Sequence, residues 1–520
     1  MKRTAALFIS LLLILSMAPA LAENAQPGWK DNTDPVTLIW FVGVNWWGTA
    51  WDTDNAAYVT AKTGVTIEYI TPMEPNQELS LMMATNDLPD IISLGFWEPT
   101  FNTLWEGGYV HALNDLADLY DPYFYQVAGA GALVWYKQDD GNTYCIPNEA
   151  YTEADMAEVG ATNANQTFLV RKDIYEAMGR PEMRTPEGFL SALRLLRDEY
   201  SEFKGRHITP MTVQSAWGYG FQEYLQSMLA VPYLKEDGSL NDRSLDETYI
   251  RWLKVFRQAF EEGLVTEDVL IEDLSGGAEK VNNGMYFCMI KEYTGVTEAN
   301  TLLYNSDPES VYITVDGPAN AALGRPNAFP GSMSGWMPVF VSKNCANPER
   351  AIQFLSYLAS EEGQMDIFLG QEGVTWDYAD GKPVFHEDVV TLMNTDVIAF
   401  NRLGVMDTYW QMRNPVVVYP WRPQQPAYIQ DMIDWANANC DYSAGIFKNL
   451  DPTGGDDAGA AWARINADWE QTLAALITAP TEAAFEAEWD AFLARREEMG
   501  YDLVKAYRQA TYEARLSKLD

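Results

Sequence analysis

Two apolar runs of strand length, separated by a segment of helix length, follow a polar leader. Residues 36–42 and 65–70 are typical of buried strands, and the segment between them is expected to be helical. A further helix at 78–85 and a short strand at 88–92 come next. Strands that alternate with helices form a parallel sheet through right-handed crossovers. The opening of the chain therefore predicts an α/β fold.

The length of the chain predicts that the fold has two lobes. Its 520 residues exceed the roughly 250 to 300 that one hydrophobic core usually serves. The later part is expected to be mostly helical, because helical apolar spacing recurs at 249–260, at 351–358 and in three segments between Ala460 and Leu516. The turn-rich stretch 451–457 is expected to be a loop and not a linker between domains.

Cap chemistry predicts two helix starts, at 185–187 (Thr-Pro-Glu) and at 347–349 (Asn-Pro-Glu). In each, the side-chain oxygen of the first residue should accept a hydrogen bond from the first turn of the helix. Proline then occupies a position where its missing N–H costs nothing, and glutamate meets the positive end of the helix dipole.

The first 22 residues have the three parts of a secretory signal peptide. Lys2 and Arg3 precede an apolar run over 5–17, and Ala20-Leu21-Ala22 forms a small-residue cleavage site. A membrane-spanning helix is the competing interpretation, but serines interrupt the run and it is shorter than the about 20 apolar residues that a span requires. We therefore expect secretion across the cytoplasmic membrane, with a mature chain that begins near Glu23.

Charge and reactive residues exclude several classes of function. The formal net charge of −39 repels phosphate backbones and anionic lipids, so neither nucleic-acid binding nor peripheral membrane binding is expected. Histidines and cysteines are scattered, without the close pairs of a zinc, redox or nucleophilic centre, so we expect no metal and no cofactor. The cysteines are interpreted as small buried residues, and the sequence leaves their disulfide pairing open: Cys145, Cys288, Cys345 and Cys440.

Short motifs occur in a definite order from residue 36 to about 400. Residues 78–91 have a helix, a polar turn and a D-[LIM]-P-D strand entry. Three other segments contain a short pattern in full: N-P-E-x-A at 347–351, G-V-x-[YW] at 373–376 and D-G-K at 380–385. Four more are similar to a pattern: 142–148 to G-x-x-Y-x-[IL]-P, 168–175 to R-K-D-W-L, 262–265 to E-G-L-I and 283–289 to S-G-K-x-A-M. In this order they resemble the motifs of extracellular solute-binding protein family 1, the substrate-binding proteins of ABC sugar importers. The helical tail is similar to that of the subfamily with alginate-oligosaccharide binders and LipO-like lipoproteins.

The resemblance implies a two-lobed fold like that of periplasmic binding proteins, with a hinge of crossing segments and a helical C-terminal extension. We expect the signal peptide to cover 1–22 and the N-terminal lobe to comprise 23–145 and 285–345. The C-terminal lobe should comprise 146–284 and 346–520, including the helical tail.

The chain departs from these relatives at two places. Many of them have a lipid-attachment cysteine at the cleavage site, whereas this chain has Ala22-Glu23, so a lipid anchor is not expected. Several also carry a calcium loop after the helix that starts at the Thr-Pro-Glu element. Residues 198–206 lack the alternating oxygen ligands and the central glycine of such a loop, so no calcium is expected there.

Aromatic side chains after the predicted strands indicate where a ligand would bind. The loops at the carboxyl ends of strands meet the ligand crevice of an α/β lobe, and flat rings beside amides and carboxylates suit a pyranose. A core position is the competing interpretation for each ring, although the adjacent Trp46 and Trp47 cannot both face one core. The candidate residues are Asn45, Trp46, Trp47, Trp51, Phe96, Trp97, Asn148 and Glu149, with Trp217, Tyr219, Trp336, Trp376 and Trp410 from the second lobe and the crossovers.

These features predict a non-enzymatic, monomeric substrate-binding component of an ABC importer, which closes two lobes around an oligosaccharide and delivers it to permease subunits in the membrane. A peptide-like ligand and a polysaccharide-binding surface protein remain alternatives. A hydrolase or lyase that uses a carboxylate pair is a further one, because 74 Asp and Glu residues make chance pairs common. No G-x-S-x-G, H-E-x-x-H or G-x-x-x-x-G-K-[ST] motif is present.

Overall fold

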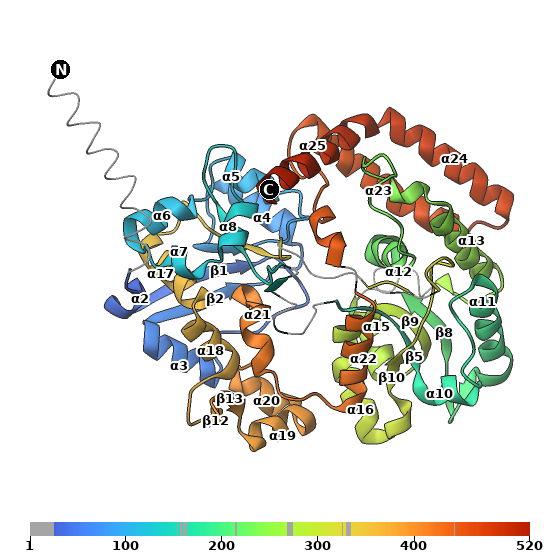
Figure 1. The fold of residues 1–520 in the computed structure, drawn as a ribbon, viewed down its shortest axis with the longest axis horizontal. Coiled ribbons are helices and arrows are strands. Elements are labelled where there is room, and N and C mark those ends of the chain that lie inside the picture. The colour runs from blue at the N-terminus through green and yellow to red at the C-terminus, as the bar shows by residue number, and fades with distance from the viewer. Residues whose placement is uncertain are drawn as a thin grey trace.

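The computed structural model describes residues 25–152, 154, 155, 159, 164–213, 216–267, 274–324, 326–328, 334–440 and 442–519. Figure 1 shows two lobes side by side, with the C-terminal helices arched along the second lobe and ending at the first. The predicted two-lobed α/β fold with a helical extension is confirmed. The predicted signal peptide lies outside the described residues.

The first lobe is built on a five-stranded sheet in the order β2-β1-β3-β11-β4. The strands are β1 (Val36–Val42), β2 (Val65–Ile70), β3 (Ile91–Ser93), β4 (Cys145–Pro147) and β11 (Pro338–Val341). β2 and β3 are parallel to β1, and β11 is antiparallel to both β3 and β4. The carboxyl ends of β1, β3 and β4 and the amino end of β11 therefore lie at one edge of the sheet, which we call the site edge.

Alternate residues of β1 face two separate cores. Leu38 and Trp40 belong to one buried cluster, and Phe41 belongs to another on the opposite face of the sheet. The helices of this lobe are α2 (Gly28–Asp31), α3 (Asp54–Thr63), α4 (Pro75–Thr85), α5 (Phe101–Glu106), α6 (Leu113–Tyr120), α7 (Phe124–Val127), α8 (Ala130–Trp135), α17 (Pro348–Ala359) and α18 (Glu361–Leu369). A small unit follows α18, with the hairpin β12 (Trp376–Ala379) and β13 (Lys382–Phe385), α19 (Glu387–Thr395), α20 (Val397–Leu403), η6 (Trp410–Met412), α21 (Pro415–Val418) and η7 (Tyr419–Trp421).

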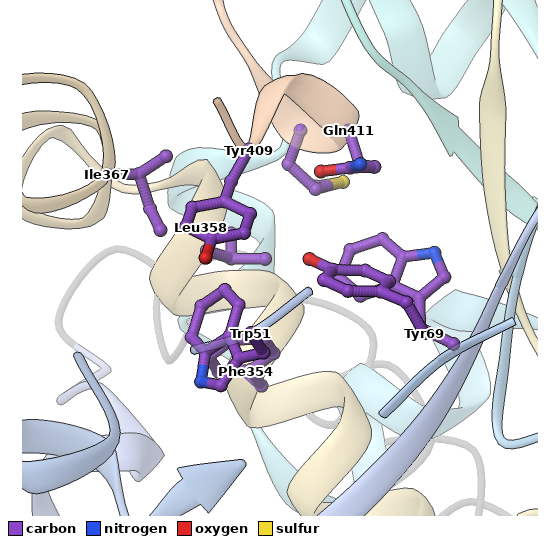
Figure 2. A pocket seen from close by; sticks show the side chains of 9 residues that line it. Trp51, Tyr69, Phe354, Leu358, Ile367, Tyr409 and Gln411 are labelled. Atoms are coloured by element: carbon purple, nitrogen blue, oxygen red, sulfur yellow. The ribbon is translucent and has the colours of Figure 1, made fainter. Parts of the chain in front are cut away.

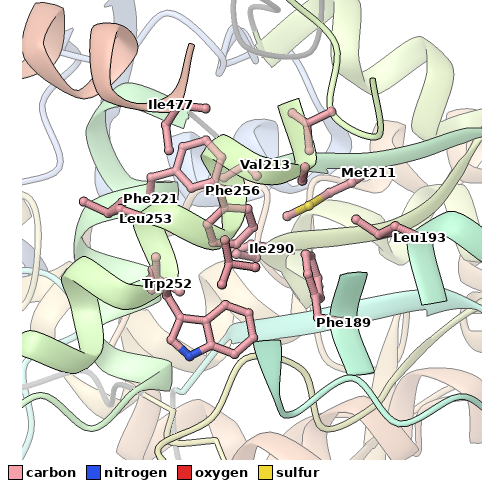
Figure 3. Packing of buried hydrophobic residues seen from close by; sticks show 14 of the residues in the cluster. Phe189, Leu193, Met211, Val213, Phe221, Trp252, Leu253, Phe256, Ile290 and Ile477 are labelled. Carbon is pink, nitrogen blue, oxygen red and sulfur yellow. The ribbon is translucent and has the colours of Figure 1, made fainter. Parts of the chain in front are cut away.

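The second lobe is built on a four-stranded sheet in the order β10-β5-β9-β8. Its strands are β5 (Gln166–Arg171), β8 (Thr209–Val213), β9 (Tyr286–Glu292) and β10 (Tyr312–Thr314), and a separate hairpin pairs β6 (Glu202–Phe203) with β7 (Arg206–His207). Its helices are α10 (Lys172–Ala177), α11 (Pro186–Leu195), η1 (Leu196–Tyr200), η2 (Ala216–Tyr224), α12 (Leu225–Met228), η3 (Arg243–Leu245), α13 (Glu247–Glu261), α15 (Leu274–Asn282), η4 (Tyr293–Val296), α16 (Thr297–Ser306), η5 (Pro308–Ser310) and α22 (Ala427–Ala438). Figure 3 shows Phe189, Trp252 and Phe256 packed together in its core, within reach of Ile477 from the tail.

The predicted division of the chain between the lobes needs correction. β9 and β10 were expected in the first lobe, but both pair with β5 in the second sheet. α17 was expected in the second lobe, but Ala351, Ile352 and Phe354 pack in the same core as β1. The chain leaves the first lobe after β4 and again after η7, and it returns to the first lobe between β10 and β11. Motif order could not locate these passages, because strand pairing between distant segments decides them.

The three predicted tail helices are confirmed as α23 (Asp457–Ile477), α24 (Glu482–Glu498) and α25 (Tyr501–Leu519). Apolar side chains of α23 and α24 complete the core of the second lobe, and α25 packs on α23 in a separate small cluster. A further short helix, η8 (Tyr442–Phe447), precedes them. The last helix also reaches the first lobe, where Lys518 Nζ donates to the carbonyl oxygens of Trp135 (3.1 Å) and Lys137 (2.9 Å). α25 therefore contacts both lobes, as Figure 1 also shows.

One predicted helix cap forms and the other does not. Thr185 Oγ1 accepts a hydrogen bond from the Gly188 N–H (3.1 Å) at the start of α11, as expected. α17 begins at Pro348 as expected, but the Asn347 side chain accepts no hydrogen bond from its first turn. The ψ of Asn347 is 60°, against 151° at Thr185, so the backbone at Asn347 lacks the extended conformation of a capping residue.

A bidentate ion pair joins α11 to the end of α13, and it makes stability depend on pH. Arg194 Nε and Nη2 each lie 2.6 Å from a carboxylate oxygen of Glu262, which lowers the pKa of Glu262 to about 2 from its usual 4.5. A lowered pKa stabilises the folded state above pH 4.5, and this contribution is lost as the pH falls toward 2. Glu262→Gln should therefore cost about 1 kcal/mol at pH 7, since the pair is partly solvent-screened. Urea unfolding should show a smaller difference between the two proteins at pH 3, and an equal difference at both pH values would contradict this account.

Candidate ligand-binding site

Residues from four strand ends converge at the site edge of the first sheet. Trp46 follows β1, Trp97 follows β3, Asn148 follows β4 and Trp336 precedes β11. Because the strands are adjacent in the sheet, residues more than 200 positions apart become neighbours. This edge faces the second lobe, where η2 follows β8 and Glu292 ends β9.

Four tryptophans at this edge form what we call the tryptophan stack: Trp46, Trp97, Trp336 and Trp410. Trp336 is at its centre, with ring centroids 6.2 Å from Trp46, 6.2 Å from Trp97 and 4.6 Å from Trp410. The interplanar angles at Trp336 are between 5° and 29°, so the rings are close to parallel. Such offset stacking holds each ring in one orientation.

The stack is buried at one side and open at the other. Trp46 is 56% exposed and Trp97 40% exposed, whereas Trp410 is buried and Trp336 half-buried. Trp47 is buried, and its Nε1 donates to the Thr408 carbonyl (3.2 Å). Of this adjacent pair, Trp47 is thus a core residue and Trp46 is open to solvent, and both rings contact Trp410. The exposed rings are large apolar surfaces that the fold holds open to solvent.

Asn148 positions the centre of the stack. Its Oδ1 accepts a hydrogen bond from the Met337 N–H (2.9 Å), next to Trp336, while its Nδ2 is buried with no acceptor among the described residues. The Trp410 Nε1 and Gln411 Nε2 groups are also buried donors without an acceptor in this described part of the chain. Unsatisfied buried donors are rare and costly, and they are typical of functional sites.

Trp51 packs against the core of the first lobe, on rings that are not members of the tryptophan stack. Its Nε1 donates to Thr60 Oγ1 (2.9 Å), and its ring packs against Tyr409 at 4.7 Å between centroids. Figure 2 shows Trp51, Tyr69 and Tyr409 around a cavity of about 10 Å³, which has room for one water molecule at most. Sequence reasoning missed Tyr69 and Tyr409, although Tyr69 lies near the carboxyl end of β2, where a ligand-facing aromatic is expected.

Asn45 and Phe96 lie beside the exposed rings. Asn45 Nδ2 donates to the Met73 carbonyl (3.4 Å), and Phe96 packs edge-on against Trp97 at 5.0 Å. Trp97 Nε1 donates to Glu98 Oε1 (3.1 Å), and burial raises the pKa of Glu98. Phe96 therefore contacts the exposed side of the stack, whereas Asn45 only precedes Trp46 in the chain and its contact with ligand stays a prediction.

Trp376 is not part of this site, so its prediction is corrected. It is buried in the β12–β13 unit with Phe368 and Phe385, and its Nε1 donates to the Gly370 carbonyl (2.8 Å). Its G-V-x-[YW] motif serves hairpin packing here. Trp217 and Tyr219 lie in η2, at the facing side of the second lobe, and their side chains lie outside the described residues. Their predicted contact with ligand stays a prediction.

Glu149 is joined to a chain of ion pairs that sequence reasoning missed, which we call the Arg413 network: Glu149, Asp407, Arg413 and Arg422. Arg413 pairs with both Glu149 and Asp407, and Arg422 contacts Asp407 through two bonds of 2.8 and 2.9 Å. Burial opposes ionisation of Asp407, but Arg413 and Arg422 still hold its pKa far below the usual value. Glu149 takes up a left-handed φ of 50°, which turns it toward Arg413.

Other features of the described residues offer no competing site. No group of three His, Cys, Asp or Glu side chains there could hold a metal ion. None of the helices in this part of the chain has the length and apolar character needed to cross a membrane. The four cysteines are free thiols, with Cys145, Cys288 and Cys345 buried and Cys440 half-buried.

Two lobes of this topology, with an aromatic site at the edge where they face each other, define the class of two-lobed solute-binding proteins. Residues 48–365 match the family described as bacterial extracellular solute-binding protein, and the chain belongs to this family. No curated protein matches the chain in sequence.

Solved structures share the whole fold at low sequence identity. The alginate-binding protein AlgQ2 is 16% identical with a TM-score of 0.70, and the comparison covers 93% of this chain and 99% of that one. The S. pneumoniae substrate-binding protein FusA, in complex with fructo-nystose, is 14% identical with a TM-score of 0.70, covering 93% and 100%. An HMO-binding, ABC-transporter-associated solute-binding protein of Bifidobacterium longum infantis is 14% identical with a TM-score of 0.65, and the comparison covers 93% of this chain and 99% of that one.

Proposed function

We propose that this protein is the extracytoplasmic substrate-binding component of an ABC importer and binds a short oligosaccharide at the tryptophan stack. The observation that carries the proposal is the stack itself, with Trp46 and Trp97 exposed at the edge that faces the second lobe. Parallel indole faces suit the apolar C–H face of a pyranose, and nearby amide and carboxylate groups suit its hydroxyls. Similar structures include proteins named for alginate, fructo-nystose and HMO binding.

Ligand capture would proceed by closure of the lobes. A ligand held on the first lobe favours the closed form only if the second lobe adds contacts to it, and Trp217 and Tyr219 are candidates for these. Permease subunits in the membrane would then recognise the closed form. We expect an exported monomer that binds no nucleic acid, consistent with the net charge of −39.

The paired carboxylates of the Arg413 network favour binding without catalysis. A glycosidase needs a carboxylic acid with a raised pKa to protonate the leaving oxygen. Asp407 and Glu149 instead pair with Arg413, and the pKa of Asp407 is lowered. Asp407 is therefore not suited to act as a general acid, and Glu98, whose pKa is raised by burial, is the carboxylate at the stack for which the reducing-end measurement below tests catalysis.

A thermal-shift screen against neutral and acidic mono- and oligosaccharides and short peptides tests the proposal. A bound oligosaccharide at 100 times its Kd should raise Tm by about 2 °C or more. Small-angle scattering with the best saccharide should show a smaller radius of gyration, and prolonged incubation should release no new reducing ends. Stabilisation by peptides alone would contradict an oligosaccharide ligand, and saccharide cleavage would contradict a purely binding role.

A further inference from the structure

The arginines beside the tryptophan stack are already neutralised. Arg413 follows Trp410 closely in the chain, and its N–H donates to the Trp410 carbonyl (3.0 Å). Its guanidinium pairs with Glu149 from one passage between the lobes and with Asp407. Asp407 also takes both bonds of Arg422, at 2.8 and 2.9 Å. One carboxylate thus serves two guanidinium groups.

Lys448, a described cation on the facing side of the second lobe, also has carboxylates around it. Glu292 ends β9 and accepts a hydrogen bond from Tyr224 Oη. Lys448 lies within the electrostatic reach of Glu223, Glu292 and Glu149. Arg413, Arg422 and Lys448 therefore each have carboxylates beside them. Glu98 adds a further carboxylate next to Trp97.

We infer that the cleft takes uncharged oligosaccharides and rejects polyuronates, and that Asp407 sets this selectivity. The inference rests on the proposed function, because it names the class of saccharide that the stack would bind. A uronate carboxylate at the stack would find no unpaired guanidinium in the Arg413 network and would have to displace Asp407 or Glu149, leaving a half-buried carboxylate unpaired. Neutral hydroxyls can bond to the network without breaking it.

Calorimetric titrations of wild-type protein and an Asp407→Asn variant test this selectivity. The probes are neutral trisaccharides (malto-, cello-, manno- and fructotriose) and trimers of mannuronate, guluronate and galacturonate. Wild-type protein should bind at least one neutral trisaccharide and bind every uronate trimer at least about 100-fold more weakly. Asp407→Asn removes the shared carboxylate and should raise uronate affinity at least about tenfold, with a gain that falls as salt is added.

Matched variants separate a local effect from a general change in charge. Glu262→Gln also removes one carboxylate from a bidentate arginine pair, but on the far side of the second lobe, and it should leave uronate affinity unchanged. Glu149→Gln removes the other carboxylate partner of Arg413 and should also raise uronate affinity. It provides the test if Asp407→Asn fails to fold.

The possible failures are distinguishable. Tight uronate binding by wild-type protein would overturn the inference and leave the proposed function intact. Unchanged uronate affinity in folded Asp407→Asn would overturn the role of Asp407. Binding of no saccharide by any variant would overturn the proposed function and the inference together.

Discussion

Replacement of Trp336 by alanine should weaken oligosaccharide binding by about 100-fold, equivalent to about 2.7 kcal/mol, while the protein stays folded. Trp336 is the only member of the tryptophan stack that contacts each of the other three rings among the described residues. Its removal takes away one stacking surface and also frees Trp46 and Trp97 to reorient. The loss should therefore exceed that of either exposed ring alone.

Titration of the best saccharide from the thermal-shift screen measures this effect. Trp336→Phe keeps an aromatic face and should recover most of the affinity. Trp462→Ala is the matched control, because Trp462 is also half-buried but lies on α23 under Arg508, at 4.6 Å from the guanidinium to the ring centroid. A Trp336→Ala variant that binds as tightly as Trp462→Ala would show that the stack is not the ligand platform.

Replacement of Gly335 by alanine should abolish binding and destabilise the first lobe by about 3 kcal/mol or more. Gly335 has a φ of +56°, and a Cβ there would lie 1.9 Å from the Asn148 carbonyl oxygen. Either Asn148 or the Trp336 segment must move, which breaks the bond from Met337 N–H to Asn148 Oδ1. The centre of the stack would be displaced.

A second glycine separates backbone strain from the clash. Gly373 has a φ of +77°, and a Cβ there would meet nothing within 4 Å. Gly373→Ala should cost only the strain of a left-handed residue, about 1 kcal/mol, and leave binding unchanged. Tm and saccharide affinity of both variants should be measured together, and similar losses in the two would contradict the close approach at Gly335.

Local patterns predicted much of the fold. The apolar runs of β1 and β2, the Thr185 cap and the tail helices depend on neighbours within a few residues, so their signals are complete in the sequence. The Asn347 cap did not form because the backbone of Asn347 has a ψ of 60°, outside the extended range of a capping residue. The lobe division failed because β9 pairs with a strand more than 100 residues earlier.

The candidate site was predicted only in part, for the same reason. Trp46 and Trp97 follow strands, so position along the chain indicates them. Trp336 and Trp410 were named from composition and resemblance, but only sheet order and the fold around η6 place them against Trp46. Trp376 had an equally suggestive motif and packs in a hairpin core instead.

The sequence alone determined that strands alternate with helices, that the chain is too long for one hydrophobic core, and that it ends in helices. Periodicity can be recognised within short segments, and length is a property of the whole chain, so neither depends on tertiary contacts. The tertiary structure decided which tryptophans stack and which remain open to solvent. It also decided that Asp407 serves both Arg413 and Arg422, next to Glu149 from a distant passage. Such pairings depend on through-space distances, because stacking requires ring contact and charge interactions are screened over about 10 Å.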